Sequence, residues 1–169
     1  MSNDFPFIEI PNAQFIFRTN FKGLKGTFNN EGERNFTVIL TDDVLKEVEE
    51  CGIPVKYTKP DANGNVTPYI KVNVGYKFRP PIAKLINSRC KRQLSEKNIG
   101  VLDDYEYSNV DIVIRPNRWR SPDGSRAGIN AYLAEIYATV LESSFASKYY
   151  DIPEEGEDDA EYEEYVPFD

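Results

Sequence analysis

Short runs of β-branched and aromatic residues, separated by turn signals, constrain the fold of this chain more than any other feature. Residues 14–19 (QFIFRT) form one such run and residues 34–40 (RNFTVIL) form another. Asn63-Gly64, a strong hairpin signal, lies between the runs at 54–58 and 66–74. This pattern predicts a mainly β domain, built as a small barrel or sandwich.

One short helix is expected within the β pattern. Thr41 or Asp42 can cap its N-terminus, and residues 44–48 (VLKEV) place their apolar side chains at helical spacing. Gly52 is a suitable residue to end it. We therefore expect a single short helix inserted between strands.

The later part of the body is harder to assign. Residues 87–98 are polar and predict a mobile loop, and residues 105–115 contain an alternating strand pattern. Residues 115–120 (RPNRWR) predict an arginine-rich surface loop around the sole tryptophan. The run at 129–141 is apolar enough for a strand or a helix, and its periodicity does not separate the two.

The composition excludes several kinds of catalytic site. The chain contains no histidine, which rules out Ser-His-Asp and Cys-His nucleophile systems and histidine-ligated zinc. Its two cysteines, Cys51 and Cys90, are too few for an all-cysteine zinc site and indicate a reducing compartment. The pairs Asp42-Asp43 and Asp103-Asp104 stand apart from any second carboxylate cluster. We expect no catalytic residue, no metal site and no cofactor.

The charge of the chain is divided between two segments. Residues 151–169 hold ten of the 28 acidic residues and none of the 20 basic ones, so the net charge is about −10 there and about +2 in residues 1–150. Acids, Gly, Pro and Tyr dominate the shorter segment, and such a composition does not support a packed core. We predict a folded domain at 1–150 and a disordered acidic tail at 151–169.

Aromatic and basic residues alternate at several points of the body. Single-stranded nucleic acid is bound by aromatic rings that stack on unpaired bases and by cations that contact phosphates. The candidate stacking residues are Phe17, Phe21, Tyr57, Tyr69, Tyr76, Phe78 and Trp119. The candidate phosphate-binding residues are Arg18, Lys22, Lys25, Arg34, Lys56, Lys71, Lys77, Arg79, Arg115, Arg118, Arg120 and Arg126.

These candidates have a purely structural alternative, because most Phe and Tyr side chains of a small β-barrel fill its core. Neighbours in a strand point to opposite faces, so only part of the set can face a ligand. Trp119 with its flanking arginines and Phe21-Lys22 are the strongest candidates.

The tail ends in an apolar plug. Val166, Pro167, Phe168 and Asp169 follow the run of acids, and we interpret them as a partner-binding tip. The tail is also suited to cover a basic groove of the body and compete with nucleic acid. The alternative is a tail that serves solubility alone.

The residues at 17–23 (FRTNFKG) and 30–36 (NEGERNF), the helix that follows and the acidic tail resemble single-stranded DNA-binding proteins encoded by bacteriophages. The tip is similar to the acidic, Pro-Phe-ending tip of bacterial single-stranded DNA-binding proteins, with Asp169 as an additional last residue. The resemblance implies an OB-fold, a five-stranded Greek-key barrel, here with an inserted short helix and extra hairpins. It also implies sequence-independent coating of single-stranded DNA in replication, recombination or repair, and recruitment of proteins of those processes by the tail.

We therefore expect a non-enzymatic single-stranded DNA-binding protein of the cytoplasm, the host cytoplasm if phage-encoded, with a possible homodimer. No membrane partner is expected, because no apolar run reaches the roughly 18 residues of a membrane span. One alternative is a protein-interaction module with a DNA-mimicking tail and no nucleic-acid binding of its own. Another is a metal-dependent nuclease, which needs a carboxylate cluster.

Overall fold

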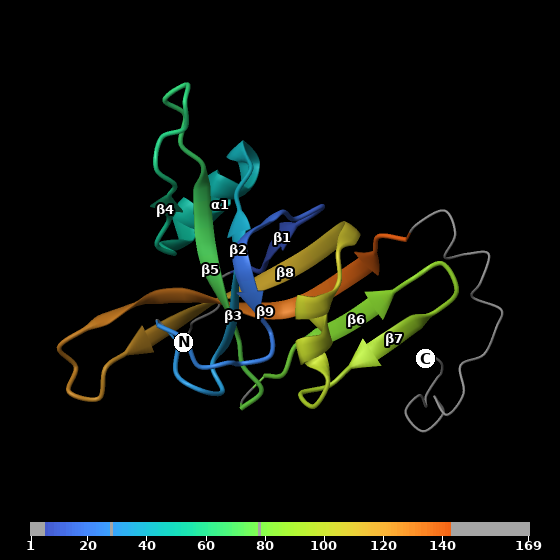
Figure 1. Ribbon diagram of the computed structural model, residues 1–169. Helices are drawn as coiled ribbons and strands as arrows, with labels where there is room; N and C mark the ends of the chain where they lie inside the picture. Colours follow the sequence, from blue (N-terminus) through green and yellow to red (C-terminus); the bar gives the residue numbers. More distant parts are fainter. Residues whose placement is uncertain (1–5, 28, 78, 143–169) are drawn as a thin grey trace.

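The computed structural model describes residues 6–27, 29–77 and 79–142, and these form a mainly β domain (Figure 1). In chain order the elements are β1 (Ile8–Ile10), β2 (Phe15–Asn20), β3 (Arg34–Ile39), α1 (Asp42–Cys51), β4 (Lys56–Tyr57), β5 (Pro68–Val74), β6 (Ile82–Ile86), β7 (Lys91–Leu94), the 3₁₀ helix η1 (Ile99–Asp104), β8 (Tyr107–Arg120) and β9 (Ala127–Val140).

The strands form one nine-stranded sheet whose central path runs β1-β8-β9-β5-β3-β2. The two ends of this path, β1 and β2, are consecutive in the chain and are separated by a turn at residues 11–12, where Asn12 has a φ of 49°. The N–H of Ala13 donates to the carbonyl of Val110 in β8 at 2.6 Å, but β1 and β2 do not pair with each other. With β1 and β2 counted as one, five strands make a partly open Greek-key barrel of the OB type.

The long β8–β9 hairpin connects the parts of the molecule (Figure 1). Near its middle β9 pairs in parallel with β5, at Val72↔Ala131, and further along it pairs in parallel with β6, at Lys84↔Tyr137. The tip of the hairpin projects past β4 and β5 at one end, and the β6–β7 hairpin lies at the other. The barrel is thereby extended in two opposite directions.

The core lies between the barrel strands and α1. The rings of Phe21 and Phe36 stack at 5.0 Å, and both are almost completely buried. Helix α1 buries Val44, Val48 and Cys51. Its C-cap, Gly52, has a φ of 89° and donates its N–H to helix carbonyls, a conformation that glycine adopts without strain. The predicted mainly β fold with one inserted α-helix is confirmed.

Three sequence expectations were wrong or incomplete. Residues 87–98 contain the strand β7, and residues 115–120 are the end of β8 rather than a loop. Pairing to β9 up to Arg120↔Ala127 keeps this segment extended. The run at 129–141 is a strand through Val140, because it has partners in β5, β6 and β8. The predicted boundary at 150 lies outside the described residues and stays a prediction.

Candidate nucleic-acid interface

The outward side of the central strands is one continuous surface, because residues paired directly across strands share a face. Val38 and Ile70 pair on the buried side of β3 and β5, whereas Thr37↔Lys71 and Asn35↔Asn73 pair on the outward side. In an OB-fold this strand pair, with the loops that flank it, is the surface that binds oligonucleotides.

The same surface continues onto β9 and β8. Asn73 pairs with Tyr132, and Tyr132 pairs with Arg115. The guanidinium of Arg115 lies 5.4 Å from the centre of the Tyr132 ring, a cation–π arrangement. The ring also covers Gly75, where an added Cβ would come within 3.1 Å of it. An aromatic face and a cation are thus held together in the middle of the surface.

Arg115 lies in a positive environment. Partial burial and the proximity of Arg79 lower its pKa, although an arginine stays protonated at neutral pH. Two nearby guanidinium groups repel each other in the free protein. A phosphate placed beside them would relieve that repulsion.

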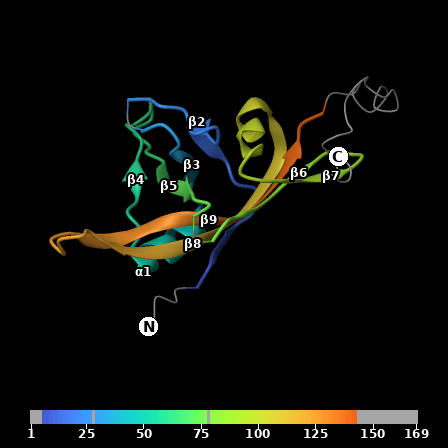
Figure 2. The ribbon, with the colours of Figure 1, turned by 90° about the horizontal axis from the view of Figure 1, so that it is seen from below.

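The hairpin tip adds an aromatic side chain to this surface. Trp119 pairs with Gly128, and an added Cβ at Gly128 would come within 3.1–3.2 Å of the indole. Glycine therefore lets the ring lie flat on the strand. Trp119 is 37% exposed and follows Arg115 and Asn117 with the two-residue period of one strand face. Figure 2 shows the tip projecting beyond the rest of the barrel.

A second aromatic group lies on β2 and β5. Phe17 is 63% exposed, and its ring meets that of Tyr69 edge-on at 5.2 Å. The backbone of Phe17 has a φ of 66°, at the register shift between Ile16 and Asn20. A positive φ is uncommon for a bulky residue, and bulges redirect side chains beside binding sites. This bulge directs a large apolar ring into solvent.

We define the outer face as the outward residues of these five strands together with the short strand β4. Lys56 of β4 pairs with Tyr69 and faces outward, whereas the exposed Tyr57 pairs with Pro68 and points to the opposite side of β4. The residues of the outer face are Phe17, Asn35, Thr37, Lys56, Tyr69, Lys71, Asn73, Arg115, Asn117, Trp119, Asn130 and Tyr132.

Three predicted site residues make contacts within the domain. Phe21 is 0% exposed, so it belongs to the core and has no free ring face for a base. Arg34 donates to the carbonyls of Phe21 and Glu96, at 3.0 and 3.3 Å, and lies over the ring of Tyr76 at 5.8 Å. The hydroxyl of Tyr76 is buried, and burial raises its pKa to about 12. Arg34 thus contacts both of the other residues.

Lys22 is exposed but already paired. Its ammonium lies 2.7 Å from the carboxylate of Asp104. The neighbouring Asp103 accepts hydrogen bonds from the Thr19 hydroxyl and from the N–H groups of Phe21 and Lys22, at 2.7, 2.9 and 2.9 Å. The chain after β2 is thereby fixed to η1, and the cation of Lys22 is partly neutralised.

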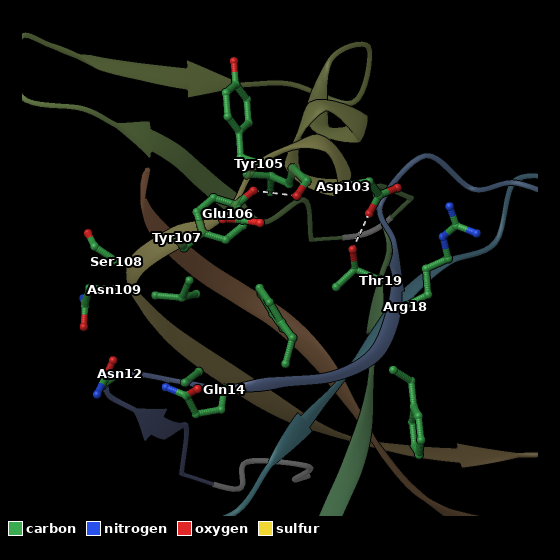
Figure 3. A pocket seen from close by; sticks show the side chains of 15 residues that line it. Asn12, Gln14, Arg18, Thr19, Asp103, Tyr105, Glu106, Tyr107, Ser108 and Asn109 are labelled. Carbon is green, nitrogen blue, oxygen red and sulfur yellow. Dashed lines mark hydrogen bonds between the residues drawn. The ribbon is translucent and has the colours of Figure 1, made fainter. Parts of the chain in front are cut away.

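A pocket of about 430 Å³ lies where β2 and β8 do not pair (Figure 3). Thr19 and Asp103 form one of its walls, and Tyr107 donates to the carbonyl of Leu102 at 2.5 Å on another. Arg18 lies at its rim. The pocket is the open seam of the barrel, and Arg18 is the predicted phosphate ligand nearest to it.

The remaining predicted cations are not part of the outer face. Arg118 and Arg120 pair with Ile129 and Ala127, so they point to the opposite side of the hairpin from Trp119. The predicted cluster of three arginines around the tryptophan is therefore divided between two faces. Lys25, Lys77, Arg79 and Arg126 are exposed in the connections. Phe78 and the predicted tail tip, Val166, Pro167, Phe168 and Asp169, lie outside the described residues.

Sequence reasoning missed Tyr132 and the asparagines of the outer face. Tyr132 lies in the run whose secondary structure the pattern left open. Once that run is a strand, Asn130 and Tyr132 alternate with the buried Ala131 and Leu133, which is the signal that identifies them.

The turn at the hairpin tip contains a strongly perturbed carboxyl. Asp123 accepts hydrogen bonds from the Ser125 N–H, the Ser121 hydroxyl and the Ser125 hydroxyl, and these lower its pKa to about 2. A lowered folded-state pKa stabilises the turn above the unfolded-state value of about 3.9, and this stabilisation is lost as the pH falls toward 2. We expect carboxyl NMR to show a midpoint near 2 for Asp123, and a higher midpoint in Ser125→Ala, which removes one of the three hydrogen bonds and keeps the backbone N–H. A wild-type midpoint near 4 would contradict the turn geometry.

Within the described ranges, no group of three or more Cys, Asp or Glu side chains is arranged to hold a metal ion. The same residues include no helix with the length and hydrophobicity that a membrane crossing needs.

A family model described as "Putative phage ssDNA-binding domain" matches residues 5–169. The chain belongs to this family. Among solved structures, it is similar to the single-stranded DNA-binding protein from bacteriophage Enc34 in complex with ssDNA, with 18% identity, a TM-score of 0.50 and coverage of 82% of this chain and 89% of the other. A C-terminal truncation of the Enc34 protein matches with 18% identity, a TM-score of 0.49 and coverage of 81% and 87%. No curated protein sequence matched the chain. The phage family and the OB-like fold expected from the sequence are confirmed.

Proposed function

We propose that this protein binds single-stranded DNA without sequence preference and has no enzymatic activity. The observation that carries the proposal is the outer face, where the aromatic rings of Phe17, Tyr69, Trp119 and Tyr132 alternate with cations on the strands that form the binding surface of an OB-fold. Membership of the phage ssDNA-binding family supports the same function.

The chemistry of the outer face favours tolerance of sequence. Every base has a π face, so ring stacking does not discriminate strongly among bases. Lys71 is exposed and Arg115 is half-buried, and both supply positive charge for phosphates, which all nucleotides share. A surface of this kind binds along single-stranded DNA without recognising its sequence.

The biological role that we propose follows from coating. The protein protects single-stranded DNA during phage replication, recombination or repair in the host cytoplasm. Its acidic tail, through Val166, Pro167, Phe168 and Asp169, recruits proteins of those processes, and the protein is able to act as a homodimer. Charge segregation in the sequence supports the role of the tail, because basic partners attract a segment with ten acids and no base.

The test is a titration of the full-length protein with oligo-dT and with a duplex of equal length, at two salt concentrations, followed by the fluorescence of Trp119. Quenching by the single strand, weakened by salt, is the expected result, because it requires stacking near Trp119 together with phosphate contacts. If neither quenching nor a gel shift occurs with the single strand, the proposal is wrong. Binding to basic proteins alone would then favour the DNA-mimicking module.

The salt dependence of binding distinguishes Lys71 from Lys22. Lys71 lies on the outer face, whereas the ammonium of Lys22 is paired with Asp104 at 2.7 Å. We expect Lys71→Ala to reduce the slope of log K against log salt by about 0.7, the value for one phosphate contact on a single strand, and Lys22→Ala to change it much less. Dissociation constants between about 50 and 300 mM salt measure both slopes, and equal changes would contradict this assignment.

A further inference from the structure

The outer face does not end at the barrel, because β9 continues along β6. Beyond the register shift in the β8–β9 pairing, Tyr137 of β9 pairs with Lys84 of β6, and Thr139 pairs with Ile86. Ala83, Leu85 and Ala138 are buried on the other side. The register shift leaves one extra residue on β9 between Tyr132 and Tyr137. These two residues therefore lie on the same side of β9, although they are five positions apart.

The β6–β7 hairpin provides a positive surface at this place. Residues 82–94 contain four basic residues and no acidic one. Lys84 pairs with Gln93, and Ile86 pairs with Lys91, so both lysines lie on the outward side of the hairpin. The exposed Arg79, close enough to Arg115 to lower its pKa, lies in the chain between β5 and β6. Cations therefore continue from the outer face toward the hairpin.

The acids near this surface are placed to one side of it or are already engaged. Asp111 lies opposite Tyr137 on β8 and accepts the N–H of Asn12 at 2.9 Å. Glu135 accepts the hydroxyl of Tyr137 at 2.7 Å. Glu142 accepts the N–H of Ser88 at 3.2 Å, at the turn end of the hairpin. Lys84 therefore lies on the β6 side of Tyr137 and Asp111 on its β8 side, and the bond to Glu135 holds the Tyr137 ring in a defined orientation.

We propose that Tyr137, Lys84 and Lys91 form a second single-stranded DNA subsite, which extends the outer face onto the β6–β7 hairpin. Tyr137 stacks on a base, and the two lysines contact phosphates. Tyr137 lies five residues beyond Tyr132 along β9, which is about 17 Å at the rise of a strand and at most about five nucleotides at the 3.4 Å spacing of a duplex strand. The subsite rests on the proposed function and adds nucleotides to its footprint.

The experiment measures the affinity of the full-length protein for oligo-dT of about 6 to 20 nucleotides, the range that spans OB-fold site sizes. In the wild-type protein, affinity rises with length until the whole site is filled. In the double variant Lys84→Glu with Lys91→Glu, we expect the rise to stop earlier by up to about five nucleotides, with affinity for the shortest oligomers within about twofold of wild type. For the longest oligomers we expect at least a tenfold loss and a salt slope lower by about 1.4.

Two further variants separate the subsite from general charge and from folding. Tyr137→Ala is expected to weaken binding of long oligomers about fivefold or more and to leave short ones unchanged. Lys46→Glu, an exposed position on α1, makes the same change of net charge as each single lysine substitution and is expected to leave the length profile unchanged. If circular dichroism shows that the double variant is unfolded, Lys84→Ala with Lys91→Ala takes its place.

The outcomes distinguish this inference from the proposed function. If the wild-type protein binds no oligomer, the proposed function fails and the subsite with it. If the wild-type protein binds but the hairpin variants keep the wild-type length profile, or lose affinity equally at all lengths, only the subsite is wrong. A gain in affinity in the hairpin variants would also overturn it, and would indicate that the hairpin holds an acidic segment such as residues 151–169.

Discussion

Replacing Tyr132 by Ala is expected to weaken the binding of oligo-dT by roughly 5- to 150-fold, the range that corresponds to about 1–3 kcal/mol for one stacked base. Tyr132 pairs with both Asn73 and Arg115, so it lies in the middle of the outer face. Its removal also leaves the guanidinium of Arg115 without the ring that holds it at 5.4 Å. A stacking partner and a phosphate ligand are therefore disturbed together.

Two matched variants show whether the ring itself is responsible. Tyr132→Phe keeps the ring and is expected to bind within about twofold of wild type, because stacking needs no hydroxyl. Tyr105→Ala removes a tyrosine that is 45% exposed and is not one of the outer-face residues, and it is expected to have no effect on affinity. Fluorescence anisotropy with a labelled oligomer measures all three. Wild-type affinity in Tyr132→Ala would remove this residue from the interface.

The sequence was most informative where local signals act alone. The helix begins after Thr41 and ends at Gly52, as expected; the Thr41 side chain makes no capping hydrogen bond, and the left-handed C-cap at Gly52 depends on neighbouring residues alone. The hairpin around Gly64, which has a φ of 81°, formed for the same reason. Turn and cap chemistry is encoded within a few residues, so a single sequence is sufficient to predict it.

Assignments failed where long-range pairing decides the conformation. The segment from Arg115 to Arg120 carries polar residues and a proline, yet β9 keeps it extended along its whole length. β7 is charged and short, and it is a strand because β6 provides a partner. No property of such segments in isolation distinguishes them from loops. Whether such a segment becomes a strand depends on a pairing partner elsewhere in the chain and on how that partner is itself paired.

The residue types of the outer face were predicted better than the individual residues that lie on it. Phe17, Tyr69, Lys71, Arg115 and Trp119 lie on the outer face as candidates. Alternation then divides the arginines at the hairpin tip between two faces, because the period of a strand is two residues. Motifs made of adjacent residues therefore overestimate a site on a sheet, and residues at i and i+2 describe it better.

Phe21 presents the sharpest contrast between sequence and structure, and its replacement is expected to have the largest effect on stability. Its side chain is 0% exposed, stacks on Phe36 at 5.0 Å and meets Phe15 edge-on at 6.3 Å. Phe21→Ala is expected to lower the free energy of unfolding by about 3–5 kcal/mol, the usual cost of removing a buried phenylalanine. Since the total for a domain is about 5–15 kcal/mol, this loss brings the protein close to unfolding.

Urea denaturation followed by circular dichroism measures the effect as a lower midpoint at an unchanged m-value. Phe7→Ala provides the control, because Phe7 is 51% exposed, and its replacement is expected to change stability by no more than about 0.5 kcal/mol. A similar midpoint for the two variants would contradict the burial of Phe21.

Binding by the folded fraction of Phe21→Ala separates a core residue from a stacking residue. The contacts of Phe21 with Asp103 and Arg34 are made by its backbone N–H and carbonyl, so the substitution leaves both in place. At a temperature where the variant is folded, we expect its affinity for oligo-dT to remain within about twofold of wild type, because no ring is lost from the outer face. A loss of affinity as large as that of Tyr132→Ala, with unchanged stability, would place Phe21 on the DNA instead. That result would require the segment after β2 to move away from η1. The hydrogen bonds that this segment donates to Asp103 would then have to break on DNA binding.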